Sequence, residues 1–189
     1  MIYGTPKKLP DGRYYLKVSG ESGRIMTQLN NVKLLTKFDE SDEVTIELSQ
    51  ASIDWISAID TENLAAAKQN SVSWFGKAMA DQTLDAAYTK SVQDGGRMNV
   101  SKATVKGSVV TKIYSHDRTV AESSVLEANA MCDVMLEFSG IWFMKKTFGA
   151  IWRVAQVRMR SPPKKVYPDE YLFQDTDEVD AEENDDDYI

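Results

Sequence analysis

The sequence predicts a mainly β fold that is interrupted by a helical insert. Three observations support this prediction: strand-like alternation before residue 49, helical spacing over about 49–93, and renewed alternation up to residue 160. The 189 residues are enough for one well-buried domain and an appendage. We therefore expect a single domain over 1–168 and a separate C-terminal tail over 169–189.

The first β-rich part contains three expected strands. Residues 13–18 and 24–36 have strand composition, and the Ser- and Gly-rich turn at 19–23 separates them. Over 44–48, valine, isoleucine and leucine alternate with polar residues, which is the period of a half-buried strand.

The helical insert follows the third strand. Ile53, Ile56 and Ile59 recur every three residues, and three consecutive alanines at 65–67 favour a helix. Several plausible N-caps favour a few short helices rather than one long helix. Asp-Gly-Gly at 94–96 ends this part.

The second β-rich part contains the remaining expected strands, over 98–115, 119–126, 132–144 and 150–160. Two prolines directly after Ser161 end it, because proline has no N–H for a β-ladder. Three strands, helices between strands 3 and 4, and further strands match the element order of an OB-fold-like five-stranded barrel with extra strands. Other small barrels and open α+β sheets share this order.

Charge is distributed unevenly along the chain. The net charge is -7, but the segment 169–189 holds eleven acidic residues and no basic one. Residues 1–168 therefore carry 22 basic and 18 acidic side chains, a net charge of +4. A mildly basic body with an acidic tail is typical of proteins of nucleic-acid metabolism. The tail is too charged to form a core, so we expect it to be disordered.

The composition argues against an enzyme. Cys132 and His116 are the only cysteine and histidine, too few for a structural zinc site or for most nucleophilic mechanisms. Acidic residues outside the tail cluster only in an expected loop around 39–43, so we assign no catalytic residue, metal or cofactor. Without a signal sequence or a long apolar run, we expect a reducing intracellular compartment and no membrane partner.

The hairpin over 136–160 is the expected nucleic-acid-binding surface, because it interleaves rings with cations and holds one acidic residue, Glu137. By alternation we expect Trp152, Arg158 and Arg160 to point outward. A bulge near residues 153 and 154 would change that assignment, and any one ring could equally be core. The predicted binding residues are Trp142, Lys145, Lys146, Phe148, Trp152, Arg153, Arg158 and Arg160, with Lys112 and Tyr114 as secondary candidates.

The end of the tail has the features of a docking segment. Tyr188 and Ile189 directly follow Asp185, Asp186 and Asp187. The ring and the aliphatic end can enter an apolar pocket of a partner while the carboxylates meet its lysines and arginines. Tethered carboxylates should also compete with phosphate for the protein's own binding surface.

Three segments carry a family resemblance: Asn-Ser-Val-Ser-Trp-Phe-Gly-Lys at 70–77, Phe-Ser-Gly-Ile-Trp-Phe at 138–143, and the run from Phe148 to Val157. They resemble the acidic-tailed OB-fold single-stranded-DNA-binding proteins of large double-stranded DNA viruses, relatives of the phage gene 2.5 type. Phage members end in phenylalanine, whereas this chain ends in Tyr188-Ile189.

The resemblance implies cooperative coverage of single strands in replication and recombination. It also implies tail contacts with polymerase and helicase or primase, in the host nucleus or at a cytoplasmic viral replication site. The expected function is therefore single-stranded-DNA binding without catalysis, and a homodimer is left open. The alternatives are an acidic-tailed chaperone for basic, histone-like proteins and a single-stranded-RNA-binding protein.

Overall fold

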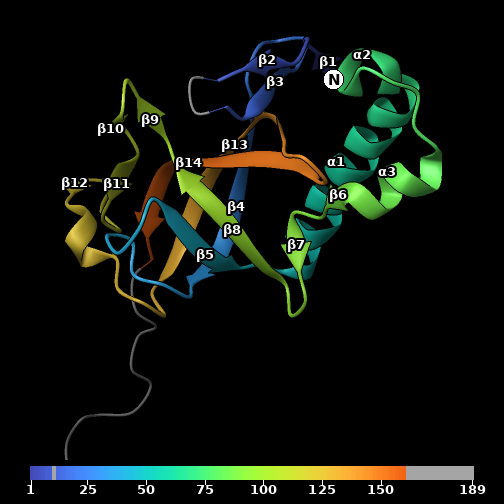
Figure 1. The fold of residues 1–189 in the computed structure, drawn as a ribbon. Helices are drawn as coiled ribbons and strands as arrows, with labels where there is room; N and C mark the ends of the chain where they lie inside the picture. Colours follow the sequence, from blue (N-terminus) through green and yellow to red (C-terminus); the bar gives the residue numbers. More distant parts are fainter. Residues whose placement is uncertain (10–11, 161–189) are drawn as a thin grey trace, which may run out of the picture.

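The computed structural model describes residues 1–9 and 12–160, and its centre is a closed five-stranded barrel (Figure 1). The expected tail, including Asp185 to Ile189, lies outside the described residues. The barrel strands are β4 (Ile25–Leu34), β5 (Glu43–Glu47), β8 (Arg97–Lys102), β13 (Met131–Phe143) and β14 (Phe148–Met159).

The barrel closes in the order β4-β5-β8-β14-β13, with β13 returning to β4. The β8–β14 pair is parallel and the other four pairs are antiparallel. A five-stranded Greek-key barrel of this kind is an OB-type barrel. The predicted mainly β, OB-like fold is confirmed.

The expected first strand lies outside the barrel. It is β3 (Tyr14–Ser19), which pairs with the last part of β13, while the first part of β13 pairs with β4. Thirteen residues make β13 long enough to serve both neighbours. The helices follow the third expected strand as predicted, yet they lie between the second and third strands of the barrel itself.

Short strands extend this framework. β1 (Ile2–Tyr3) and β2 (Lys7–Lys8) pair with β3 at one edge of the sheet, and β11 (Lys112–Tyr114) runs parallel to β14. The strand expected over 98–115 is divided, because β8 ends at Lys102 and a small hairpin follows. The remaining short elements are β6 (Tyr88–Thr89), β7 (Val92–Gln93), β9 (Thr104–Val105), β10 (Ser108–Val109), β12 (Val120–Ala121) and the 3-10 helix η1 (Ser123–Val125).

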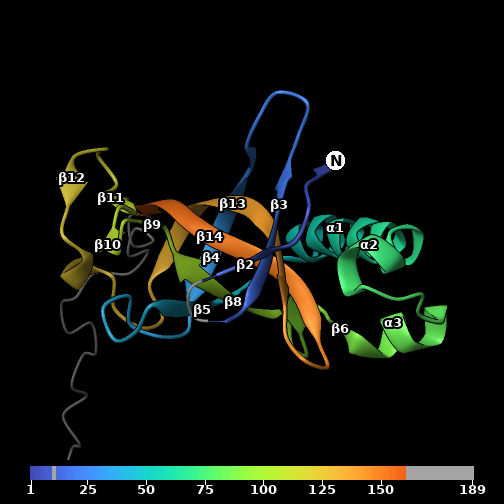
Figure 2. The ribbon, with the colours of Figure 1, turned by 45° about the horizontal axis from the view of Figure 1, so that its top comes forward.

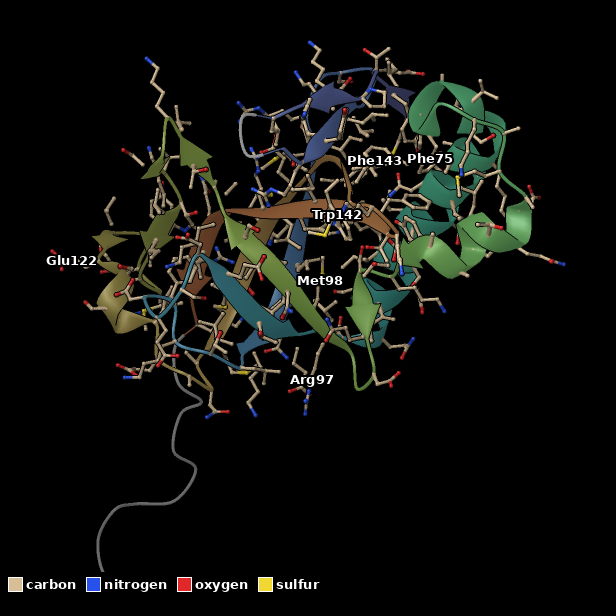
Figure 3. All side chains as sticks on the ribbon, in the orientation of Figure 1. Phe75, Arg97, Met98, Glu122, Trp142 and Phe143 are labelled. Atoms are coloured by element: carbon tan, nitrogen blue, oxygen red, sulfur yellow. The ribbon has the colours of Figure 1, made fainter. Side chains whose placement is uncertain are left out.

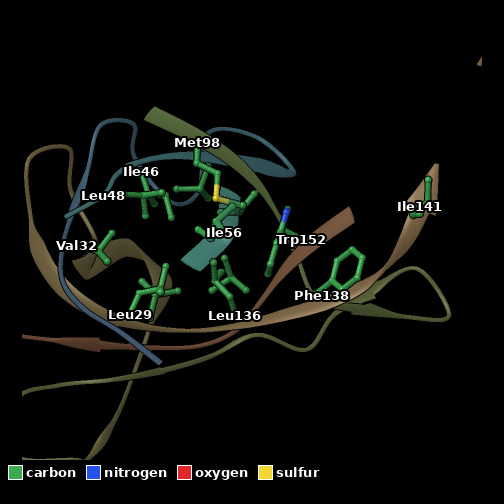
Figure 4. Close-up of a cluster of buried hydrophobic side chains, with 14 of the residues drawn as sticks. Leu29, Val32, Ile46, Leu48, Ile56, Met98, Leu136, Phe138, Ile141 and Trp152 are labelled. Atoms are coloured by element: carbon green, nitrogen blue, oxygen red, sulfur yellow. The ribbon is translucent and has the colours of Figure 1, made fainter. Parts of the chain in front are cut away.

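Three helices cover one side of the barrel (Figures 1 and 2): α1 (Gln50–Gln69), α2 (Ser71–Phe75) and α3 (Asp81–Ala87). The Ser49 side chain caps α1 by accepting a hydrogen bond from the Ser52 N–H. Ile56 of α1 is fully buried and lies with Ile46, Met98 and Leu136 in the barrel core (Figure 4). No helix in the described part of the chain is long and apolar enough to span a membrane.

A buried polar network holds α1 against the chain that leads into β8. The Asp60 carboxylate accepts hydrogen bonds from the Tyr88 hydroxyl and from both the N–H and the hydroxyl of Ser91, each 2.7 Å long. Asn63 donates to the Tyr88 hydroxyl and accepts from the Tyr3 hydroxyl. Burial raises the pKa of Asp60 above its ordinary value, although these hydrogen bonds oppose the shift.

Candidate nucleic-acid interface

A bulge in β14 decides which hairpin side chains face outward. Met135 pairs with Gln156 but Leu136 pairs with Val154, so Ala155 has no partner on β13. One unpaired residue reverses the alternation. Before the bulge, Trp152 and Val154 point into the core, whereas after it Val157 does.

The prediction that Trp152 and Phe148 contact nucleic acid is therefore wrong, because both rings are buried. Trp152 is 4% exposed, and its indole N–H donates a 2.8 Å hydrogen bond to the Ser91 hydroxyl. Phe148 is 1% exposed and stacks against Phe143 with ring centroids 6.0 Å apart. Figure 3 shows Phe143 beside Phe75 of α2, where the hairpin meets the helices. Both rings are core because the inner side of the hairpin packs against the helices and the barrel interior.

The side of the hairpin that points away from the core carries the other predicted residues. Side chains at paired positions of neighbouring strands lie on the same side of a sheet. The register thus gives five rows, which we call the outer face: Lys7–Tyr15–Trp142, Lys17–Gly140–Ile151, Glu137–Arg153, Lys112–Gln156–Met135 and Tyr114–Arg158–Asp133.

Two aromatic rings of the outer face lie against glycines. A Cβ atom on Gly149 would be 3.0 Å from the Trp142 ring, and one on Gly140 would be 2.6 Å from the Tyr15 ring. The Tyr15 hydroxyl also donates a 2.6 Å hydrogen bond to the Ser139 carbonyl, which fixes that ring. Both rings remain half-buried. Rings that lie against a sheet and stay partly exposed are suited to stacking with bases.

Cations surround these rings. Among the described residues, no carboxylate forms an ion pair with Lys7, Lys17, Lys112 or Arg153. The carboxylates of the outer face are already neutralised: Glu137 lies 3.6 Å from Arg24, and Asp133 binds Arg158 and Arg160. The outer face is therefore cationic where it is free to bind an anion.

The remaining predicted residues lie at the two ends of the outer face. Lys145 and Lys146 are exposed in the turn between β13 and β14, which the Met144 N–H closes by donating to the Thr147 carbonyl. Lys112 and Tyr114 lie on β11, where they pair with Gln156 and Arg158. The structure thus brings Trp142, Arg153, Arg158, Lys112 and Tyr114 together on one surface.

Sequence reasoning missed Tyr15 and Lys7 as members of the outer face. Their positions depend on β3 pairing with the end of β13, a contact between residues more than 120 positions apart. The available signal was the single glycine inside each of the two strands, Gly140 in β13 and Gly149 in β14, because glycine inside a strand marks a close approach of another group.

The face of β5 and β8 is a weaker candidate. In OB folds the face of the second and third barrel strands binds oligonucleotides. Here the outward side chains of those two strands are Glu43, Thr45, Glu47, Arg97, Asn99 and Ser101. They include two carboxylates and a single cation, and Thr45 donates a hydrogen bond to Asn99. This surface lacks the charge and the rings that a polynucleotide requires.

No group of three His, Cys, Asp or Glu side chains in the described ranges 1–9 and 12–160 could hold a metal ion. The chemistry of the outer face is that of hydrogen-bond donors, positive charge and aromatic surface.

Comparison with known proteins gives a family and a set of structural neighbours. The model of DUF5871, described as a family of unknown function, matches residues 30–175. The chain belongs to the DUF5871 family. No curated protein matches it.

Structural neighbours of this DUF5871 chain include single-stranded DNA-binding proteins from bacteriophage Enc34. A complex with single-stranded DNA is 13% identical, with a TM-score of 0.48, and the match covers 84% of this chain and 95% of that chain. A C-terminal truncation of the phage protein is 12% identical, with a TM-score of 0.49, and the match covers 83% of this chain and 94% of that chain. A third structure of the phage protein is 12% identical, with a TM-score of 0.48, and the match covers 89% of this chain and 97% of that chain.

Proposed function

We propose that this protein binds single-stranded DNA along the outer face, without catalysis. The observation that carries the proposal is the row of Lys7, Tyr15 and Trp142 beside Arg153. Two rings lie on glycines, and the cations around them have no carboxylate partner among the described residues. Rings for bases and cations for phosphates are the two components of single-strand binding.

The outer face has the length of an oligonucleotide site. The twelve residues of β14 span about 40 Å at about 3.3 Å per residue. Cations lie along this whole length, from Arg158 near one end to Lys145 and Lys146 at the other. Stacking and phosphate contacts do not read base edges, so binding should tolerate any sequence.

The tail adds two proposed roles that rest on its sequence. Its eleven carboxylates compete with phosphates for the outer face, so that bound DNA releases the tail. The released end, Asp185 to Ile189, then recruits polymerase and helicase or primase during replication and recombination. Deleting residues 175–189 should raise the affinity for single strands at low salt, and an unchanged affinity would eliminate the competition.

Tryptophan fluorescence, titrated with single-stranded and duplex DNA of equal length, tests the main proposal. We expect quenching and tighter binding with oligothymidine than with the duplex, because a duplex cannot offer base faces to Trp142. A third arm with oligouridine tests RNA. Preference for duplex, or no binding of any single strand, would overturn the proposal.

A further inference from the structure

A bulge in β4 places a backbone donor beside a buried carboxylate at one end of the outer face. Cys132 pairs with Val32 and Val134 with Leu29, so Asn30 and Asn31 together face the single residue Asp133. Asn31 has a φ of 57°, in the left-handed region that asparagine adopts more readily than most residues. In this conformation its N–H donates a 3.0 Å hydrogen bond to Oδ1 of Asp133.

Asp133 binds two arginines as well as this N–H. Its Oδ2 accepts from Nε and Nη2 of Arg158, at 3.2 and 2.5 Å, and its Oδ1 accepts from Nε of Arg160 at 2.8 Å. The carboxylate is 5% exposed, whereas each arginine side chain is 43% exposed. Burial alone would raise the pKa of Asp133, but the hydrogen bonds from Arg158 and Asn31 and the two positive charges hold it below its ordinary value.

The two guanidinium groups border a shallow hollow of the surface. His116, Asp133, Arg158, Met159 and Arg160 line it. Nε and Nη2 of Arg158 donate to the Asp133 carboxylate. Nε of Arg160 donates to the same carboxylate, and its Nη1 donates to the Asn31 side-chain oxygen. A guanidinium has five N–H donors, so each arginine keeps N–H groups that no residue within 1–9 or 12–160 is seen to occupy and that can bind an anion.

We propose that Arg158 and Arg160 form a fixed site for one backbone phosphate of the bound strand, with Asp133 as its positioning residue. This inference rests on the proposed function and assigns a distinct role to one end of the same face. Lysines elsewhere on the face are flexible and lose side-chain freedom on binding. The two arginines are already held in place by Asp133, so a phosphate meets them at less entropic cost.

The proposal predicts a result opposite to simple electrostatics. Removing a negative charge from a DNA-binding face should strengthen binding if charge alone matters. We expect D133N to weaken oligothymidine binding by about fivefold or more, because two arginines must then be immobilised on binding. We also expect the slope of log affinity against log salt to become shallower by up to about 0.7, because arginines that Asp133 no longer holds neutralise this phosphate in only part of the complexes.

Glu137 supplies the matched control. It lies on the same strand and the same face, it is paired with a single arginine, and E137Q removes the same charge. We expect E137Q to bind as tightly as the wild type or more tightly. Fluorescence anisotropy of labelled oligothymidine across a salt series measures all variants, and thermal melting checks that each is folded.

A second variant decides the matter if D133N does not fold. R158K keeps the net charge and changes a half-exposed side chain, but it loses the fork that Asp133 holds. We expect it to weaken binding as D133N does. Wild-type affinity in R158K, or tighter binding by D133N, would overturn the phosphate site alone, whereas a wild-type protein that fails to bind single strands would overturn the proposed function.

Discussion

The indole N–H of Trp152 donates a 2.8 Å hydrogen bond to the hydroxyl of Ser91, which in turn donates to the Asp60 carboxylate. This pair connects β14 to the buried polar network of α1. The Trp152 ring also contacts Trp55 and Phe138, with centroids 5.9 and 5.1 Å away. Trp152 therefore fixes the inner side of the strand whose outer side carries Arg153.

Replacing Trp152 should change stability rather than affinity. We expect Trp152→Phe to lower the free energy of unfolding by about 1–2 kcal/mol, because the hydrogen bond to Ser91 is lost and a smaller ring fills the core. Urea denaturation measures this. Trp55 is the exposed partner in the same ring contact, so the free energy of unfolding of Trp55→Phe should lie within about 0.5 kcal/mol of the wild-type value. If Trp152→Phe were as stable as the wild type but bound DNA more weakly, this ring would contact DNA and the assignment to the core would be wrong.

Trp142 should behave in the opposite way. We expect Trp142→Ala to weaken binding of oligothymidine by about 1–3 kcal/mol, because its ring stacks with a base. The titration is run on protein shown to be folded by circular dichroism. Trp55→Ala, on α1 and away from the outer face, should bind as the wild type does. Equal affinities of the Trp142→Ala and wild-type proteins would show that this ring does not contact DNA.

Cations of the outer face should set the salt dependence. We expect Lys112→Gln and Arg153→Gln each to make the log-log salt slope shallower by about 0.7, because each removes one phosphate contact. Lys77→Gln, in the turn between α2 and α3, removes the same charge from a residue outside the five rows of the outer face and should leave the slope unchanged. If Lys112→Gln and Arg153→Gln kept the salt slope of the wild type, as Lys77→Gln should, the DNA strand would bind elsewhere on the protein.

Gly140 should not accept a side chain. A Cβ atom there would lie 2.1 Å from the Leu16 carbonyl oxygen and 2.6 Å from the Tyr15 ring. We expect Gly140→Ala to destabilise the fold by about 2 kcal/mol or more, since β3 must move away from β13. At Gly20 a Cβ would make only an ordinary 3.5 Å contact, so Gly20→Ala is the control in the same thermal-melting series. An unchanged melting temperature for Gly140→Ala would contradict the close approach of β3.

Acid should abolish the contribution of Asp133 to stability. Its pKa is lowered in the fold, so its stabilising effect is complete above the unfolded value of about 3.9 and is lost as the pH falls through the folded value. The difference in unfolding free energy between wild type and Asp133→Asn should therefore be largest near pH 6 and shrink toward pH 2. A difference that is constant between these pH values would mean that folding does not lower the pKa of Asp133.

Local pattern predicted where the helical insert and the main strands lie, but not the lengths of all elements or their arrangement. The three-residue spacing of Ile53, Ile56 and Ile59 predicted the helical insert, because one face of α1 packs on the barrel and Ile56 enters its core. The same pattern contains no information on which strands close the barrel. The strand at 14–19 was expected to belong to it, yet its pairing with the far end of β13 places it outside.

The assignment of the hairpin rings failed for a physical reason. Alternation predicts the side of each residue only while the register is unbroken, and the bulge at Ala155 breaks it between Trp152 and Arg158. A bulge near residues 153 and 154 was the feature that would change the assignment, and the bulge lies directly after them. Charge was a better guide than parity, since Arg153, Arg158 and Lys112 share the outer face despite the wrong assignment of Trp152.

Ultraviolet cross-linking of the full chain to oligothymidine, with the linked residues identified by mass spectrometry, tests the binding surface most directly. The outer-face account predicts cross-links at Tyr15 and Trp142, with Tyr114 toward the other end. Cross-links confined to Trp55 and the helices, or to β5 and β8, would contradict it.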